Sequence, residues 1–322
     1  TSMYLIGQGR YPFILEITDE SQIKGHHMFD KKKVNDLVLS SLAADAYSLG
    51  AHWIYDAQQL ETLDINWEVL NDAQASWHEG KLAGDFTHYG DQTLWLYQFL
   101  EGKEHFDVSD YMAFWQSKIE SYHGYIDGAV KGTLENIENK VIPTGSASID
   151  TSIIGRIAPL LLVSDSKEAF LDNVVHFVTS THNSQELIVA SKFFASVLVE
   201  VLAGKGIEQA ILELKTGYDT TIQAYIDKGL DSHSANTVDA IRSFGAACGI
   251  GGGFPSVIHL LAKYDNLKDM LIQNAKAGGD SSGRAMIATI IFMAQKNKSM
   301  DEIPSAWLKI NATIAESMRS AP

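Results

Sequence analysis

Apolar residues recur at three- and four-residue steps along most of this chain, which is the spacing of one buried face of an α-helix. After Lys31 the recurring residues are Val34, Leu37, Val38, Leu42, Ala46 and Leu49. A second clear segment runs from Leu187 to Leu202, with Gly204 as its expected stop. Further helices are predicted over residues 109–122, 128–139, 152–163, 207–227, 236–247, 254–264, 267–277 and 305–318.

Two polar patterns predict where helices begin. Asp165-x-x-Glu168 and Asn183-x-x-Glu186 match the capping box, in which the first side chain accepts from a free helix N–H group. Strand signals after residue 28 are weak, because alternating apolar runs are short and no hairpin dipeptide joins two of them. We therefore predict an all-α fold, with residues 28–322 forming one compact multi-helix domain.

Residues 1–27 differ from the rest of the chain. Residues 10–18 favour a short strand, and Gly25-His-His-Met28 is similar to the scar that cloning leaves beside a tag. Residues 1–27 are either such a remnant or a genuine N-terminal extension, and the sequence does not decide between the two.

Composition narrows the class of protein. The chain has 322 residues, of which 45% are hydrophobic, and a formal net charge of -15. This charge repels nucleic acid and anionic membranes, so we expect neither as a partner. The single cysteine, Cys248, cannot form an internal disulfide, which fits a reducing compartment. With no apolar run near the ~20 residues of a membrane helix and no signal-peptide pattern, we predict a cytoplasmic protein.

The stretch from Ala277 to Ala294 is the first candidate for chemistry. Gly278 and Gly279 allow positive φ angles, and Asp280 or Ser281 can cap the apolar helix that follows. Free N–H groups and a carboxylate would then gather at one point, where an anion or a metal can bind. The alternative is a capped core helix behind a glycine turn.

Two other stretches also place an acid among glycines or small residues. Asp45 lies in an apolar helix with His52 on the same stripe, and Asp91 follows glycine at the start of another helix. A buried carboxylate needs a cation, donors or a metal, although each acid alone is also explained as a helix cap. The glycines at 249–253 predict a turn and a close helix approach, since no Lys-Ser/Thr follows them as in a P-loop.

Taken in order, these pieces resemble the ADP-ribosylglycohydrolase superfamily, and more closely its J-crystallin-like branch. The resemblance extends from Met28 to the end of the chain. It rests on Ala44-Asp-Ala with His52-Trp-Ile-Tyr-Asp56, Tyr89-Gly-Asp-Gln-Thr93, Gly155-Arg-Ile-Ala-Pro-Leu160, Thr181-His182, Phe254-Pro-Ser-Val-Ile-His-Leu-Leu, Gly278-Gly-Asp280 and Ile303-Pro-Ser-Ala-Trp-Leu308.

The resemblance implies an all-α domain with a central site for two Mg²⁺ or Mn²⁺ ions. Active members cleave the glycosidic bond that joins ADP-ribose to a protein side chain or a small molecule. The metals and their carboxylates would position the ribose and the attacking water.

This chain departs from the superfamily's ligand motifs. The Thr-Asp-Asp positions carry Gly90, Asp91 and Gln92, and the Asp-x-Asp-Thr positions carry Asp280, Ser281, Ser282 and Gly283. Two of the four expected carboxylates are therefore missing, and anionic oxygens dominate the affinity for hard cations. We expect one Mg²⁺ ion at most, bound weakly or not at all, with Asp91 and Asp280 as its ligands.

Two functional hypotheses follow. In the first, the protein is a hydrolase that cleaves a glycosidic bond of a small-molecule or protein-linked ADP-ribose-like substrate. Asp45 would be the base, and Asp91 and Asp280 would hold the metal or the ribose. Further substrate contacts would come from His52, Gln92, Ser281, Ser282 and the N–H groups near Gly278 and Gly279. In the second, the protein binds ADP-ribose or a nucleotide without catalysis, or is structural like the crystallins.

Overall fold

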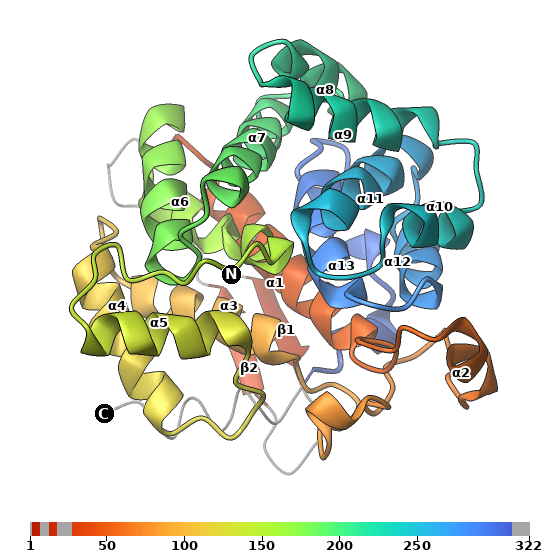
Figure 1. Ribbon diagram of the computed structural model, residues 1–322, viewed down its shortest axis with the longest axis horizontal. Coiled ribbons are helices and arrows are strands. Elements are labelled where there is room, and N and C mark those ends of the chain that lie inside the picture. The colour runs from red at the N-terminus through yellow and green to blue at the C-terminus, as the bar shows by residue number, and fades with distance from the viewer. Residues whose placement is uncertain (1, 7–12, 18–27, 311–322) are drawn as a thin grey trace.

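The computed structural model describes residues 2–6, 13–17 and 28–310, and its elements after residue 28 are helices (Figure 1). The α-helices are α1 (Lys31–Ser48), α2 (Ala57–Thr62), α3 (His88–Leu100), α4 (Val108–Glu120), α5 (Gly128–Glu138), α6 (Lys167–Thr181), α7 (Gln185–Leu202), α8 (Ile207–Lys215), α9 (Thr220–Asp231), α10 (Thr237–Phe244), α11 (Ile250–Lys263), α12 (Leu267–Lys276) and α13 (Ser281–Met293). Short 3-10 helices are η1 (Ser76–His78), η2 (Thr151–Arg156), η3 (Ala158–Val163), η4 (Met300–Glu302) and η5 (Ser305–Leu308). The predicted all-α class is confirmed.

A two-stranded hairpin precedes the helices. Strand β1 (Ser2–Ile6) pairs antiparallel with β2 (Phe13–Ile17), so that Ser2 lies opposite Ile17. The strand predicted for residues 10–18 is present as β2. The remainder of residues 1–27, including the Gly-His-His run, lies outside the described residues.

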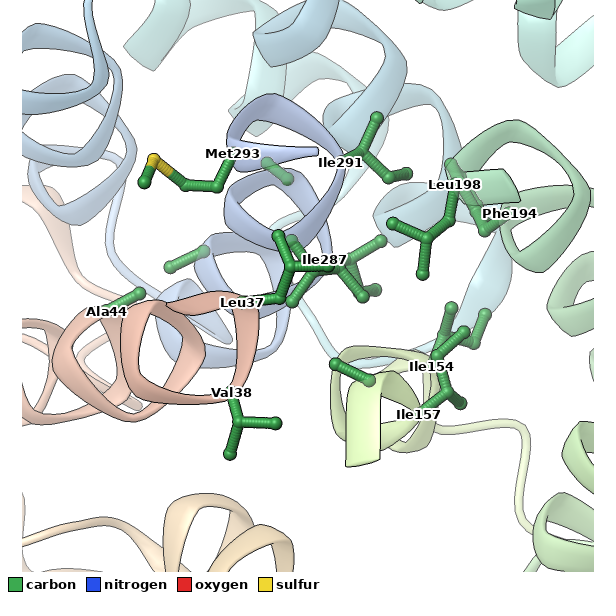
Figure 2. Packing of buried hydrophobic residues seen from close by; sticks show 14 of the residues in the cluster. Leu37, Val38, Ala44, Ile154, Ile157, Phe194, Leu198, Ile287, Ile291 and Met293 are labelled. Atoms are coloured by element: carbon green, nitrogen blue, oxygen red, sulfur yellow. The ribbon is translucent and has the colours of Figure 1, made fainter. Parts of the chain in front are cut away.

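The core is built around α13, all of whose side chains are buried. It packs against α1, η2, α11 and α12. Figure 2 shows Ile287 and Ile291 of α13 between Leu37 of α1 and Leu198 of α7. Full burial of each such side chain contributes about 1.5–3 kcal/mol. Because α13 is held on every side, the acid that precedes it has a fixed position.

Three predicted helices differ from the structure. Residues 207–227 form two helices, because the chain turns after α8 and Asp219 caps α9 by accepting from Thr221 N at 2.9 Å. Residues 152–163 form the 3-10 helices η2 and η3, since Pro159 lacks an N–H group and restricts the residue before it. In the predicted helix 305–318 only η5 is seen, and residues 311–318 lie outside the described part.

The predicted helix starts are displaced. Helix α6 is capped by Ser166, not Asp165, and α7 begins after Ser184, whose side chain makes no capping bond. The glycines at 249–253 are not a turn but the N-cap and first residues of α11. They do permit the expected close approach, because a Cβ on Gly252 would lie 2.0 Å from Gly245 O. None of the helices in the described residues is long and apolar enough to cross a membrane.

Candidate functional site

Asp45 joins three elements at the centre of the site. It lies on α1 and is fully buried. Thr87, just before α3, donates to it through its backbone N–H at 2.9 Å and its hydroxyl at 2.6 Å, and the Ser282 hydroxyl on α13 donates at 2.5 Å. Burial raises the pKa of Asp45 to about 7, against the opposing effect of these hydrogen bonds. The segments singled out in the sequence therefore meet.

Two glycines make room for carboxylates at the positions where the superfamily has threonines. A Cβ on Gly90 would lie 2.2 Å from Asp45 Oδ2, and a Cβ on Gly283 would lie 2.3 Å from Asp280 Oδ2. Both distances are far inside van der Waals contact. The loss of the threonines thus changes where the two carboxylates can lie, in addition to removing two hydroxyl oxygens.

Asp280 occupies the N-cap position of α13, but its side chain makes no capping bond. Its Oδ1 accepts instead from the Tyr89 hydroxyl at 2.9 Å, and that hydroxyl lies 3.2 Å from Asp150 Oδ2. Burial, then the nearby Asp280 charge, raises the pKa of Asp150 to about 7. Because one hydroxyl proton cannot serve two carboxylates, the contact with both acids is satisfied when one of them holds a proton of its own.

The Gly278–Gly279 loop is fixed by close backbone contacts. Gly278 and Gly279 have φ of 70° and 62°, respectively. A Cβ on Gly278 would lie 2.3 Å from Ile54 O, and a Cβ on Gly279 would lie 2.2 Å from Ala246 O. Gly279 N donates to Ile54 O at 2.7 Å, and Asp280 N donates to Ala246 O at 2.8 Å. The expectation that these N–H groups are free to face a phosphate is therefore wrong, since carbonyl groups of the protein already use them.

Arg284 holds this loop from inside. Its buried guanidinium donates to Gly278 O at 2.5 Å, to Asn274 Oδ1 at 2.7 Å and to Ala246 O at 3.1 Å. Burial lowers its pKa to about 10, so it stays charged at neutral pH. The guanidinium thus positions the backbone that carries Asp280.

Asp91 is not the cap of its helix. Thr87 caps α3 by accepting from Tyr89 N at 3.1 Å, and Asp91 lies one turn further in. Asp91 Oδ2 accepts from Lys81 Nζ at 2.8 Å and from the Tyr122 hydroxyl. Burial raises the pKa of Asp91, although Lys81 acts in the opposite direction. Its charge is matched by a lysine from a loop.

Gln92 is held by hydrogen bonds to its side-chain oxygen. Its Oε1 accepts from Trp115 Nε1 at 3.0 Å and from Arg156 at 3.2 Å. The Arg156 guanidinium also lies 5.0 Å from the ring centroid of Tyr89, a cation–π distance. The carbonyl of Gln92 therefore has partners within the protein, whereas its Nε2 is buried and has no hydrogen-bond partner in the described residues.

His52 closes one side of the carboxylate cluster. Its Nδ1 accepts from Ser282 N at 3.3 Å and lies 3.9 Å from Asp280 Oδ1. Burial lowers the pKa of His52, so the ring is neutral with its proton on Nε2. The ring stacks on Trp53, whose φ of 63° is rare for a side chain of this size. The Ser281 hydroxyl is buried and makes no hydrogen bond in the described residues.

An open groove of about 580 Å³ borders this cluster on the side of Asp91. Its wall contains Trp77, which is 54% exposed, and Tyr125, with ring centroids 5.7 Å apart. Lys81 and Tyr122, the two partners of Asp91, line the same groove. Solvent therefore reaches the groups that contact Asp91, although the carboxylate itself is buried.

The donor set does not fit the metal site that the superfamily resemblance implies. Within the described residues, no group of three or more His, Cys, Asp and Glu side chains is arranged to hold a metal ion. Asp91 is paired with an ammonium group, and both Asp45 oxygens accept hydrogen bonds. Mg²⁺ is usually held by one or two carboxylates with water completing an octahedral shell, and here the charge of Asp91 is already balanced by Lys81.

Sequence reasoning missed several residues that build the site. Tyr89 and Arg156 lie inside motifs that carry the resemblance, so the sequence contains a signal that identifies both as candidate site residues. Arg284 lies in the first candidate stretch, where an arginine among apolar residues signals a buried guanidinium with acceptors nearby. Asp150 and Lys81 lie in polar loops, where nothing distinguishes them from solvated side chains.

Known proteins are similar to this chain over most of its length. A model of the ADP-ribosylglycohydrolase family matches residues 28–315. Crystallin J1A and crystallin J1B of Tripedalia cystophora are 22% identical over 309 residues and 21% identical over 301 residues, and each comparison covers 86% of this chain and 91% of the relative. A solved chain described as an ADP-ribosylglycohydrolase-related protein complex has a TM-score of 0.64 at 18% identity, covering 90% of this chain and 97% of that one. This last likeness concerns the fold alone.

Proposed function

Because this chain belongs to the ADP-ribosylglycohydrolase family, we propose that it binds an ADP-ribose-type ligand and needs no divalent metal to do so. Such a ligand presents an aromatic base, a diphosphate with two negative charges, and sugar hydroxyls. The groove beside Asp91 has a partner for each of these three groups.

The observation that carries the proposal is the composition of the groove wall. Trp77 and Tyr125 offer ring faces on which a base can stack, and stacking on an aromatic side chain contributes about 1–3 kcal/mol. Lys131 lines the same groove and provides positive charge for a diphosphate, whereas the ammonium group of Lys81, which also lines it, is paired with Asp91. The groove volume of about 580 Å³ lies within the usual range for small-molecule sites.

One acid in the groove wall can bind the sugar. Glu79 lines the groove, is exposed and can accept hydrogen bonds from ribose hydroxyls. Asp85 also lines it, but its side chain is buried and its Oδ2 accepts from Leu82 N at 2.7 Å. Their charges offset those of the lysines, so the local field is weaker than in a dedicated polyphosphate site. We therefore expect an affinity in the micromolar range, which corresponds to about 8 kcal/mol.

Hydrolysis of the glycosidic bond is a second candidate function, and one observation favours it. Asp150 and Asp280 share the Tyr89 hydroxyl, and the pKa of Asp150 is about 7, which suits an acid or base near neutral pH. Two carboxyl groups without a metal suffice for glycoside hydrolysis in other enzymes. The predicted base, Asp45, has both oxygens engaged, so catalysis through it would first have to break bonds from Thr87.

The test is binding of ADP-ribose to wild-type protein and to Trp77→Ala. We expect the variant to bind about 5- to 150-fold more weakly, because one stacking partner is lost. Leu212→Ala is the matched control, since Leu212 is 47% exposed on α8 and does not line the groove. Equal binding by wild type and Trp77→Ala would place the ligand elsewhere. Release of free ADP-ribose from an ADP-ribosylated protein, measured in parallel, separates hydrolysis from binding alone.

A further inference from the structure

We propose that the ammonium group of Lys81 is a built-in cation at Asp91, in the position that a divalent metal would need in order to bind this carboxylate. The inference deepens the proposed function, on which it rests for the location of the site. Its test measures the response to metals and not to ADP-ribose, so the two can fail separately.

The Lys81–Asp91 pair is mostly buried, with only the lysine in contact with solvent. The Lys81 side chain is 15% exposed and that of Asp91 is fully buried, with 2.8 Å between Nζ and Oδ2. A carboxylate without a counter-charge in such surroundings is strongly disfavoured. Lys81 thus provides the compensation that a metal ion provides in a site built from several carboxylates.

The loop that carries Lys81 holds the side chain in place. Lys81 N donates to His78 O at 3.0 Å, and Lys81 O accepts from Ala73 N at 3.1 Å. Gly80 makes the turn before it with φ of 86°. The Tyr122 ring lies 5.9 Å from Nζ, and its hydroxyl donates to the same Asp91 oxygen. The ammonium group is therefore positioned by its backbone as well as by its charge.

A metal ion and this ammonium group exclude one another. Mg²⁺ binds carboxylate oxygens at about 2.0–2.1 Å and carries two charges. Oδ2 already accepts from two donors, so a metal at this oxygen would lie next to a positive charge in a region of low dielectric constant. The other oxygen, Oδ1, is buried and has no hydrogen-bond partner. Removal of the lysine side chain would leave Asp91 as an uncompensated carboxylate that favours any small cation.

The experiment compares the melting temperature of wild type and Lys81→Ala with Mg²⁺, Mn²⁺ and methylammonium. We expect no shift for wild type, and a rise of about 2 °C or more for Lys81→Ala with Mn²⁺ or methylammonium. Lys81→Arg keeps a cation and should stay insensitive to metal. The double variant Lys81→Ala with Asp91→Asn should lose the response that Lys81→Ala gained.

A surface pair is the matched control. Lys215 is paired with Asp227, whose side chain is half exposed, so Lys215→Ala leaves a carboxylate that water can solvate and should gain no response to metal. If Lys81→Ala folds but responds to none of the three cations, the proposal is overturned. If Lys81→Ala does not fold, Mn²⁺ binding to wild type decides. If wild type binds Mn²⁺ and Asp91→Asn abolishes this binding, the proposal is overturned. If wild type shows no Mn²⁺ binding that depends on Asp91, the proposal is supported.

Discussion

Gly90 provides a sharp test of the arrangement around Asp45. Alanine normally stabilises the interior of a helix relative to glycine by about 1 kcal/mol. On α3, however, the new Cβ would lie 2.2 Å from Asp45 Oδ2 and 2.8 Å from Phe86 Cβ. Asp45 would have to move, although it accepts from Thr87 N at 2.9 Å and from the Thr87 hydroxyl at 2.6 Å. Gly90→Ala should therefore destabilise the protein.

The magnitude follows from three contributions. Overpacking of a filled site costs about 1–3 kcal/mol, and loss of a hydrogen bond to a charged acceptor costs about 1.5–3 kcal/mol. The gain in helix propensity offsets about 1 kcal/mol of this. The net loss is about 1.5–5 kcal/mol, or a fall in Tm of roughly 2–7 °C for a chain of this size.

The assay is urea unfolding of Gly90→Ala in wild-type and Asp45→Ala backgrounds. With Asp45 truncated the nearest clash disappears, so the same substitution should cost less, and the remaining cost comes from the contact with Phe86 Cβ at 2.8 Å. Gly128→Ala on α5 is the control, because nothing lies within 4 Å of its Cβ position and no loss is expected there. A Gly90→Ala protein as stable as wild type would refute the described position of the Asp45 carboxylate.

The buried charges lead to two further expectations. The pKa of Asp45 is about 7 in the folded state and 3.8 otherwise, so the folded state holds the extra proton and stability falls as pH rises from about 4 to 7. Asp45→Asn should flatten urea-derived stability across this range, and an unchanged slope would count against the assignment. Arg284→Met should lower the free energy of unfolding by about 3 kcal/mol or more, since it removes donors to the Gly278 loop. Arg242→Met, at a half-buried arginine on α10, should cost far less than this.

Much of the fold is predictable because buried helices have a strong period. The face from Val34 to Leu49 identifies α1 almost to its ends, and residues 267–277 match α12 to one residue. The errors occur where local chemistry overrides the period. Asp219 starts a new helix where apolar spacing continues, and Pro159 forces 3-10 geometry within an apolar run.

The site is predictable in its anchors but not in its connections. Asp45, His52, Asp280 and Ser282 lie together in the structure, although the sequence paired Asp280 with Asp91 and did not place Asp45 relative to either. The pairing of Asp91 with a lysine ten residues earlier is not predictable, because it depends on the path of a loop without periodic pattern. The expectation of free backbone N–H groups near Gly279 is also wrong. Carbonyl groups distant in the sequence, on Ile54 and Ala246, accept from this loop.

The most direct test of the central claim is calorimetric titration of wild-type protein with ADP-ribose, once in EDTA and once in Mg²⁺. The arrangement of Lys131, Trp77 and Tyr125 around the groove predicts binding with the same affinity in both solutions. Binding that appears in Mg²⁺ and vanishes in EDTA would contradict the account, as would the absence of binding in both.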